Sequence, residues 1–112
     1  QSGRMAFCGS VACWMGGVRA GPHYAASKGG VHALVRWLAQ RGTPHNVMVN
    51  GVAPGVIDTG MTSGHGYQAH TQPMKRLGQA EEIAHVLSFL VSPGASFMAG
   101  CILDANGGIL MR

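Results

Sequence analysis

The sequence contains little charge and few aromatic side chains. Charged residues make up 11% of the 112 residues, and only four residues are acidic. Eight Lys and Arg residues give a net charge of +4 but are spread singly along the chain, without the basic cluster that nucleic-acid binding needs. No apolar run approaches the ~18 residues of a membrane span, and residues 1–10 lack the basic and apolar regions of a signal peptide. We therefore expect neither nucleic-acid nor membrane partners.

Cysteine is scarce as well. Cys8, Cys13 and Cys101 are odd in number and form no CxxC pair, so neither a disulfide framework nor a zinc knuckle is expected. Reduced thiols in the cytoplasm are the simpler interpretation. Six histidines are present, but none forms an HExxH pair, and no metal site is predicted.

Apolar residues and glycines are abundant, and their pattern predicts a folded domain. Hydrophobic residues account for 46% of the chain, with 18 glycines. Short apolar runs bounded by glycine, proline or serine predict strands at 5–8, 46–52 and 101–105. Spacings of three and four predict helices at 24–40 and 81–91, with Pro22 just inside the start of the first. Between them, residues 59–78 have no sustained periodicity, which predicts a mobile flap or short irregular helices.

The longer predicted helix carries two features that make specific predictions. Its expected buried face consists of Val31, Leu34, Val35 and Leu38. Gly29 and Gly30 would each weaken an isolated helix by up to ~1 kcal/mol. We therefore expect another backbone or side chain to approach the helix closely at these two glycines.

The order strand, helix, strand, helix, strand predicts an α/β fold with parallel strands and right-handed crossovers. Three strands and two main helices leave sheet edges and faces uncovered, so they form half of an open α/β sheet rather than a whole one. We therefore predict that residues 1–112 are one partial domain.

Three polar residues stand where chemistry is expected in this fold. Tyr24 and Lys28 are four residues apart at the start of the long helix, on the same face one turn apart. An ammonium near a phenol favours the phenolate, which could exchange a proton with an alcohol or a carbonyl. Ser10 follows the first predicted strand, and sites in open α/β sheets lie at the carboxyl ends of strands. In isolation, each of these residues is more often a surface or turn residue.

Their joint order resembles a known family. The segment GSVACWMGGVRAGPHYAASKGG resembles the active-site segment of the short-chain dehydrogenase/reductase family, in which a serine precedes a YxxxK helix. Three further segments match the family in order: NVMVNGVAPGVIDTGMT, RLGQAEEIAHVLSFLVS and GCILDANGG. Within the family, the look is closest to 3-oxoacyl-(acyl-carrier-protein) reductases.

The resemblance implies that residues 1–112 are the carboxyl-terminal half of a Rossmann-like, doubly wound parallel sheet, and that the amino-terminal cofactor half is absent from the segment. It also implies hydride transfer between a nicotinamide cofactor and a carbonyl or alcohol carbon. By this resemblance Tyr24 is the catalytic acid or base, and Ser10 polarises the substrate oxygen. Lys28 favours the ionised phenol and binds the ribose hydroxyls of the cofactor. The residues expected to bind the cofactor are Tyr24, Lys28, Pro54, Gly55, Ile57 and Thr59.

The same resemblance implies the ligands and partners. The cofactor is NADP or NAD, with NADP preferred, and the substrate is a small carbonyl or alcohol compound, such as a 3-oxoacyl thioester. The long helix at 24–40 is expected to form a homo-oligomer interface, as its equivalent does in family tetramers. Its Leu34, Trp37 and Leu38 also allow an alternative interpretation, a non-catalytic association module that retains a remnant of an active site.

The departures from the family pattern concern the serine and the cofactor turn. Thirteen residues separate Ser10 from Tyr24 where twelve are common, and Phe7 and Gly9 replace more usual polar residues. Residues 64–69 spell GxGxxA, but they follow an irregular loop rather than a first strand, so we do not interpret them as a dinucleotide-binding turn.

Overall fold

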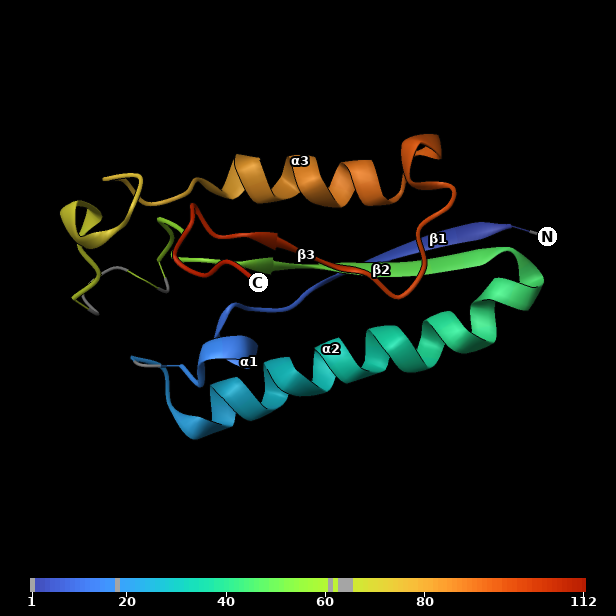
Figure 1. Ribbon diagram of the computed structural model, residues 1–112, viewed down its shortest axis with the longest axis horizontal. Helices are drawn as coiled ribbons and strands as arrows, with labels where there is room; N and C mark the ends of the chain where they lie inside the picture. Colours follow the sequence, from blue (N-terminus) through green and yellow to red (C-terminus); the bar gives the residue numbers. More distant parts are fainter. Residues whose placement is uncertain (1, 18, 61, 63–65) are drawn as a thin grey trace.

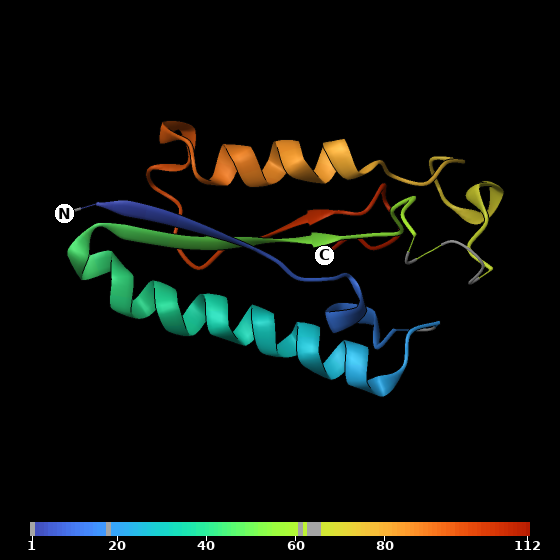
Figure 2. The ribbon, with the colours of Figure 1, turned by 180° about the vertical axis from the view of Figure 1, so that it is seen from behind.

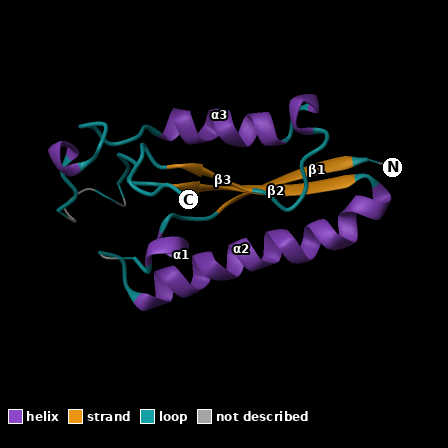
Figure 3. Cartoon of the chain, in the orientation of Figure 1, coloured by secondary structure: helices purple, strands orange, loops and turns teal. Residues whose placement is uncertain are grey.

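The computed structural model describes residues 2–17, 19–60, 62 and 66–112. The elements are β1 (Gly3–Cys8), α1 (Ala12–Met15), α2 (Pro22–Gly42), β2 (Val47–Pro54), α3 (Ala80–Leu90) and β3 (Ile102–Ala105), with 3-10 turns at Thr43–His45, Ala69–Thr71 and Pro93–Ala95 (Figure 3). All five predicted strands and helices are present, each shifted by a few residues at most. The four-residue helix α1 was not predicted, since it is too short to show a period.

The strands form a parallel sheet in the order β1-β2-β3. Helix α2 covers one face of this sheet and α3 covers the other, and the view from behind shows the same three layers (Figures 1 and 2). The predicted α/β class is therefore confirmed. The carboxyl ends of the strands point to the end of the molecule where α1 and the start of α2 lie, so this end gathers the candidate site residues.

The core lies between α2 and the middle strand. Val35 and Ala39 of α2 pack with Val49 of β2, with the half-buried Phe7, Leu38, Val47 and Ile102 around them. The buried part of β2 also contains a polar residue, Asn50, which is fully buried. Its side chain donates to the carbonyl of Met98 at 3.0 Å and accepts from the amide of Cys101 at 3.0 Å. Asn50 thereby fixes the chain where it enters β3.

Helix α2 begins at Pro22 as predicted, but its buried face differs from the predicted one. His32, Val35 and Ala39 are buried, whereas Leu34 is 43% exposed. The prediction for Leu34 is therefore wrong. The face of α2 that contains His32, Val35 and Ala39 packs on the sheet, so Leu34 lies on the outer flank of the helix.

The expected close approach at Gly29 and Gly30 is not found. A Cβ atom added at either glycine would meet nothing within 4 Å in the described structure. No backbone among the described residues therefore requires a glycine at either position.

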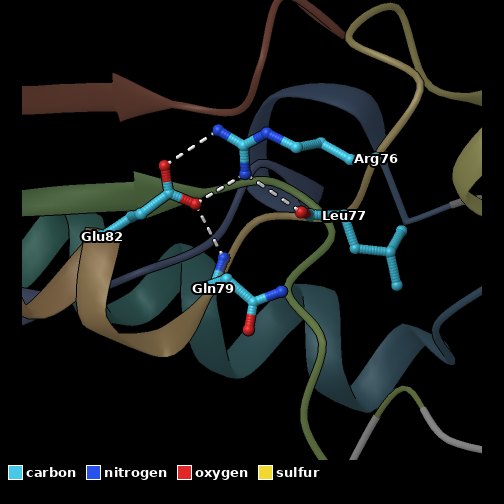
Figure 4. Close-up of polar contacts among 4 residues, drawn as sticks. All are labelled: Arg76, Leu77, Gln79 and Glu82. Carbon is cyan, nitrogen blue, oxygen red and sulfur yellow. Dashed lines mark hydrogen bonds and ion pairs between the residues drawn. The ribbon is translucent and has the colours of Figure 1, made fainter.

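Helix α3 buries Ile83 and Leu90 against the sheet, as predicted. Its first turn is held locally. The Glu82 carboxylate accepts the Gln79 backbone amide at 2.9 Å and pairs with both terminal nitrogens of Arg76, at 2.7 and 2.9 Å (Figure 4). This arrangement satisfies an amide that has no partner inside the helix.

The segment before α3 is irregular, as predicted. Its described part contains the 3-10 turn Ala69–Thr71 and a single parallel bridge between Ile57 and Gly78. Gly64 of the GxGxxA pattern lies outside the described residues. Across the described ranges, we find no helix both long enough and apolar enough to cross a membrane.

Candidate active site

Ser10 lies at the end of β1, where the backbone continues to follow β2. The Gly9 amide donates to the Val52 carbonyl at 2.7 Å, and the Val11 amide donates to the Pro54 carbonyl at 2.9 Å. Ser10 is 6% exposed, and its hydroxyl oxygen accepts the Ala12 amide at 3.0 Å. A hydroxyl that accepts this bond keeps its own proton for donation to another group.

Tyr24 and Lys28 lie one turn apart at the start of α2, as predicted from their spacing. The Lys28 ammonium nitrogen is 6.0 Å from the centre of the Tyr24 ring. It also donates to the Cys8 carbonyl at 3.2 Å, which ties α2 to the residue that ends β1. An ammonium has three donors, so this bond leaves two for other partners.

Ser10 and Tyr24 line the same cavity, which has a volume of about 240 Å³. Gly55 lies in its wall, on the chain that leaves β2, and Tyr67 and Ile109 close it from two further segments. The structure therefore brings together Ser10, Tyr24 and Gly55, of which Tyr24 and Gly55 are predicted cofactor residues, whereas Lys28 does not line this cavity. A few polar groups on an apolar lining are typical of a small-ligand site.

The remaining predicted cofactor residues lie elsewhere around the end of β2. Ile57 lines a second cavity of about 420 Å³, which shares Gly55 with the first. Pro54 and Thr59 line neither of these two cavities. The Pro54 carbonyl is used by the Val11 amide, and the Thr59 amide donates to the Thr62 hydroxyl at 3.0 Å. The roles expected for Pro54, Ile57 and Thr59 stay predictions.

Comparison with known proteins identifies the family to which this arrangement belongs. A family model described as enoyl-(acyl carrier protein) reductase matches residues 1–110. The chain is 43% identical over 116 residues to the 3-oxoacyl-(acyl-carrier-protein) reductase FabG of Pseudomonas aeruginosa, covering 97% of this chain and 46% of that protein. A solved short-chain dehydrogenase/reductase from Brucella melitensis, titled a glucose/ribitol dehydrogenase, superimposes with a TM-score of 0.87 at 40% identity. The chain belongs to the short-chain dehydrogenase/reductase family. The predicted resemblance is confirmed.

The short-chain dehydrogenase/reductase structures also show how much of the family fold is present. The Brucella structure matches over 97% of this chain and 46% of its own. A putative 2-deoxy-D-gluconate 3-dehydrogenase from Agrobacterium tumefaciens, solved with bound NADP, matches over 100% of this chain and 48% of its own, at 32% identity and a TM-score of 0.87. The chain spans about half the length of the relatives it matches.

Sequence reasoning missed one buried residue of the site, His32. It is 2% exposed, and its Nε2 atom accepts the Ser10 backbone amide at 3.2 Å. Burial and then the neighbouring Arg36 guanidinium hold the pKa of His32 below its usual value of 6.5. The spacing could have indicated this residue, because position 32 lies on the same helix face as Tyr24 and Lys28, one more turn along α2.

Trp14 of α1 was also missed, although it packs beside His32. The two ring centres are 4.9 Å apart, and the indole nitrogen of Trp14 donates to Asp104 at 3.1 Å. The Arg112 guanidinium lies 3.8 Å from the Trp14 ring and pairs with Asp104 at 3.0 Å. Contacts across 90 residues of chain carry no local sequence pattern, so this cluster could not be predicted.

Cys13 lies in the same short helix. Burial raises its pKa above the usual 9.0. A thiol that stays protonated is a poor nucleophile, so nothing in the site points to cysteine chemistry at this position.

Proposed function

We propose that the protein containing this chain is an oxidoreductase that transfers hydride between NADP or NAD and a small carbonyl or alcohol substrate. The observation that carries the proposal is the shared cavity, because Ser10 and Tyr24 approach it from different elements while Lys28 stands beside the Tyr24 ring. Family membership supports the same chemistry.

Each residue in the proposed mechanism has one task. The Ser10 hydroxyl donates its free proton to the substrate oxygen and polarises the carbonyl. Tyr24 gives its phenolic proton to that oxygen during reduction and takes it back during oxidation. Lys28 stabilises the phenolate by its positive charge and holds the hydroxyls of the cofactor ribose with its remaining donors.

The residues present fit the nicotinamide end of the cofactor. Ser10, Tyr24 and Gly55 line one cavity, and the cofactor would supply the hydride there. Pro54, Gly55, Ile57 and Thr59 are proposed to line the nicotinamide side. No GxGxxG-type turn follows a strand within residues 1–112, so we propose that residues outside this segment hold the pyrophosphate.

NADP is the cofactor we propose first, and a 3-oxoacyl thioester the substrate. The solved relative from Agrobacterium tumefaciens holds NADP, and the similar Pseudomonas aeruginosa protein is named a 3-oxoacyl-(acyl-carrier-protein) reductase. The predicted boundary of a single partial domain over residues 1–112, and a cytoplasmic location, stay predictions.

The test is turnover of an acetoacetyl thioester by the complete protein, followed by the loss of NADPH absorbance. Tyr24→Phe removes the proton donor and keeps the ring, so we expect kcat to fall by about 10²–10⁴-fold. His23→Ala is the matched control, because His23 is exposed in the same turn of α2 and lines neither cavity. Equal turnover by Tyr24→Phe and the wild-type protein would refute the assigned role.

A second candidate function is association without catalysis. Leu34 and Trp37 of α2 are 43% and 52% exposed, which favours a homo-oligomer through this helix. Leu38 packs on the core instead and contributes less to that surface. Trp37→Gln, with the mass measured by light scattering, separates the two candidate functions. Dissociation with loss of turnover would mean that catalysis depends on the assembly. Dissociation with full turnover would assign the surface to assembly alone.

A further inference from the structure

His32 is the third polar residue on the stripe of α2 that begins with Tyr24 and Lys28. Unlike them it is fully enclosed, at 2% exposed, between the end of β1 and α1. One contact gives its side chain a defined direction. Its Nε2 atom lies 3.2 Å from the Ser10 backbone nitrogen.

The bond fixes the protonation of the ring. A backbone amide can only donate, so Nε2 must offer a lone pair, and the neutral imidazole carries its proton on Nδ1. That Nδ1 atom is buried and has no hydrogen-bond partner among the described residues. An apolar residue would fill the same space without burying an unpaired polar atom. Space filling alone therefore does not account for histidine at this position.

Gly9 shows that the backbone is shaped around the imidazole. A Cβ atom at position 9 would lie 2.0 Å from His32 Nε2 and 2.2 Å from its Cδ2. Both atoms belong to a rigid ring, so any side chain at position 9 would displace it. Gly9, which departs from the family pattern before the serine, thus leaves the space that the His32 ring occupies.

The ring is also held on its other side. Trp14 lies against it with ring centres 4.9 Å apart, and Asp104 and Arg112 hold Trp14 in turn. Contacts from β3 and the carboxyl-terminal residues therefore reach the serine through Trp14 and His32.

We propose that His32 is a positioning residue that sets the backbone of Ser10, and through it the direction of the serine hydroxyl in the cavity. Gly9 gives it room, and Trp14 limits its rotation. The inference rests on the proposed function, because it assigns His32 a role only if Ser10 acts on the substrate.

The hydrogen bond can be tested on the wild-type protein by NMR. A bond from the Ser10 amide to an imidazole nitrogen gives a scalar coupling between the two ¹⁵N nuclei, which no other histidine should show. The exposed His23 and His45 are internal controls. We expect the coupling at His32 Nε2 near neutral pH. Its absence in a folded protein would overturn the proposal whatever the variants do.

Kinetics of the complete protein then test the role. His32→Leu keeps the bulk but removes the acceptor, and we expect kcat to fall by up to about 100-fold with little change in KM for the cofactor. His32→Gln places an oxygen near the position of Nε2, so it should recover most of that loss. A merely structural role would make the two variants lose stability alike and leave kcat per folded molecule unchanged.

Ser10→Ala separates the two proposals. Loss of turnover in Ser10→Ala together with full kcat in His32→Leu would refute the positioning role and leave the proposed function standing. Full turnover in Ser10→Ala would refute the proposed role of the serine. The NMR coupling, measured on wild-type protein, decides the hydrogen bond even where His32→Leu does not fold.

Discussion

The two long helices cover opposite faces of one sheet, but they are held in different ways. Helix α3 is fixed by its own neighbours in sequence, since Glu82 binds the Gln79 amide and the Arg76 guanidinium within one turn of the helix start. Helix α2 has no side-chain cap at its start. Its first turns are tied instead to the end of β1, through Lys28 to the Cys8 carbonyl and through His32 to the Ser10 amide.

This difference predicts that stability and function are coupled at α2 and separate at the start of α3. The polar contacts at the start of α3 are local and exposed, so changing them should affect the start of α3 and little else. The contacts of α2 run through the residues that flank Ser10, so a change there should alter both the fold and the candidate site.

Replacing Gly9 with Ala should have the largest effect on stability. The added methyl group would overlap the His32 ring, and forcing extra volume into a packed site costs about 1–3 kcal/mol. Urea denaturation of Gly9→Ala measures this loss. In the double variant with His32→Ala the overlap disappears, so the cost of the methyl group should largely vanish; an unchanged cost would contradict the coupling of the two residues.

Lowering the pH should reduce the free energy of unfolding through protonation of His32 in α2. Its pKa is lowered in the folded protein, so the unfolded chain binds the proton more readily. The stabilisation is therefore complete above pH 6.5 and is lost as the pH falls through the folded value. Lys28 and Arg36 of α2 and the Arg112 guanidinium disfavour the charged ring, while Asp104 of β3 favours it. Trp14 packs against the ring from α1.

Free energies of unfolding measured between pH ~7.5 and ~5.5 check this dependence. The slope should flatten in His32→Gln and persist in His23→Gln, whose ring is exposed in the wild-type protein. The same slope in both variants would assign the pH effect to other groups.

Replacing Gly30 with Ala should be mildly stabilising. Nothing lies within 4 Å of a Cβ atom there, and alanine in a helix interior is favoured over glycine by about 0.5–1 kcal/mol. Thermal unfolding of Gly30→Ala measures the gain. A loss instead, in the complete protein, would mean that another part of the protein approaches this position, which the sequence had led us to expect.

Replacing Glu82 with Gln should have the smallest effect. The Arg76 side chain holds the pKa of Glu82 at about 2, against a usual 4.5, so the stabilisation exists above pH 4.5 and is lost as the pH falls through about 2. Both partners are exposed, so added salt should weaken the pair. Circular dichroism at several salt concentrations checks this; a loss of the whole fold in place of a local change at α3 would contradict the separation of the two helices.

Much of the fold was predictable because its signals are local. The strands follow from short apolar runs such as 46–52, and the helix around Ile83 and Leu90 from their spacing. The pairing of Tyr24 with Lys28 follows from helix geometry. What was not predicted depends on partners far along the chain. Leu34 was expected to be buried, because spacing does not tell which flank of a helical stripe packs on the sheet. The role of His32 depends on its contacts with Gly9 and Trp14, which the sequence alone does not show.

Backbone hydrogen bonds hold the strand ends beside the cavity. Backbone amides donate to backbone carbonyls from Gly9 to Val52, from Val11 to Pro54 and from Gly55 to Ala105, so no side chain takes part in these bonds. The opposite wall, including Tyr67 and Gln72, belongs to a segment with its own local turns. Exchanging residues of that wall alone can therefore change the shape of the cavity. This end of the molecule is a natural starting point for redesign of the substrate range.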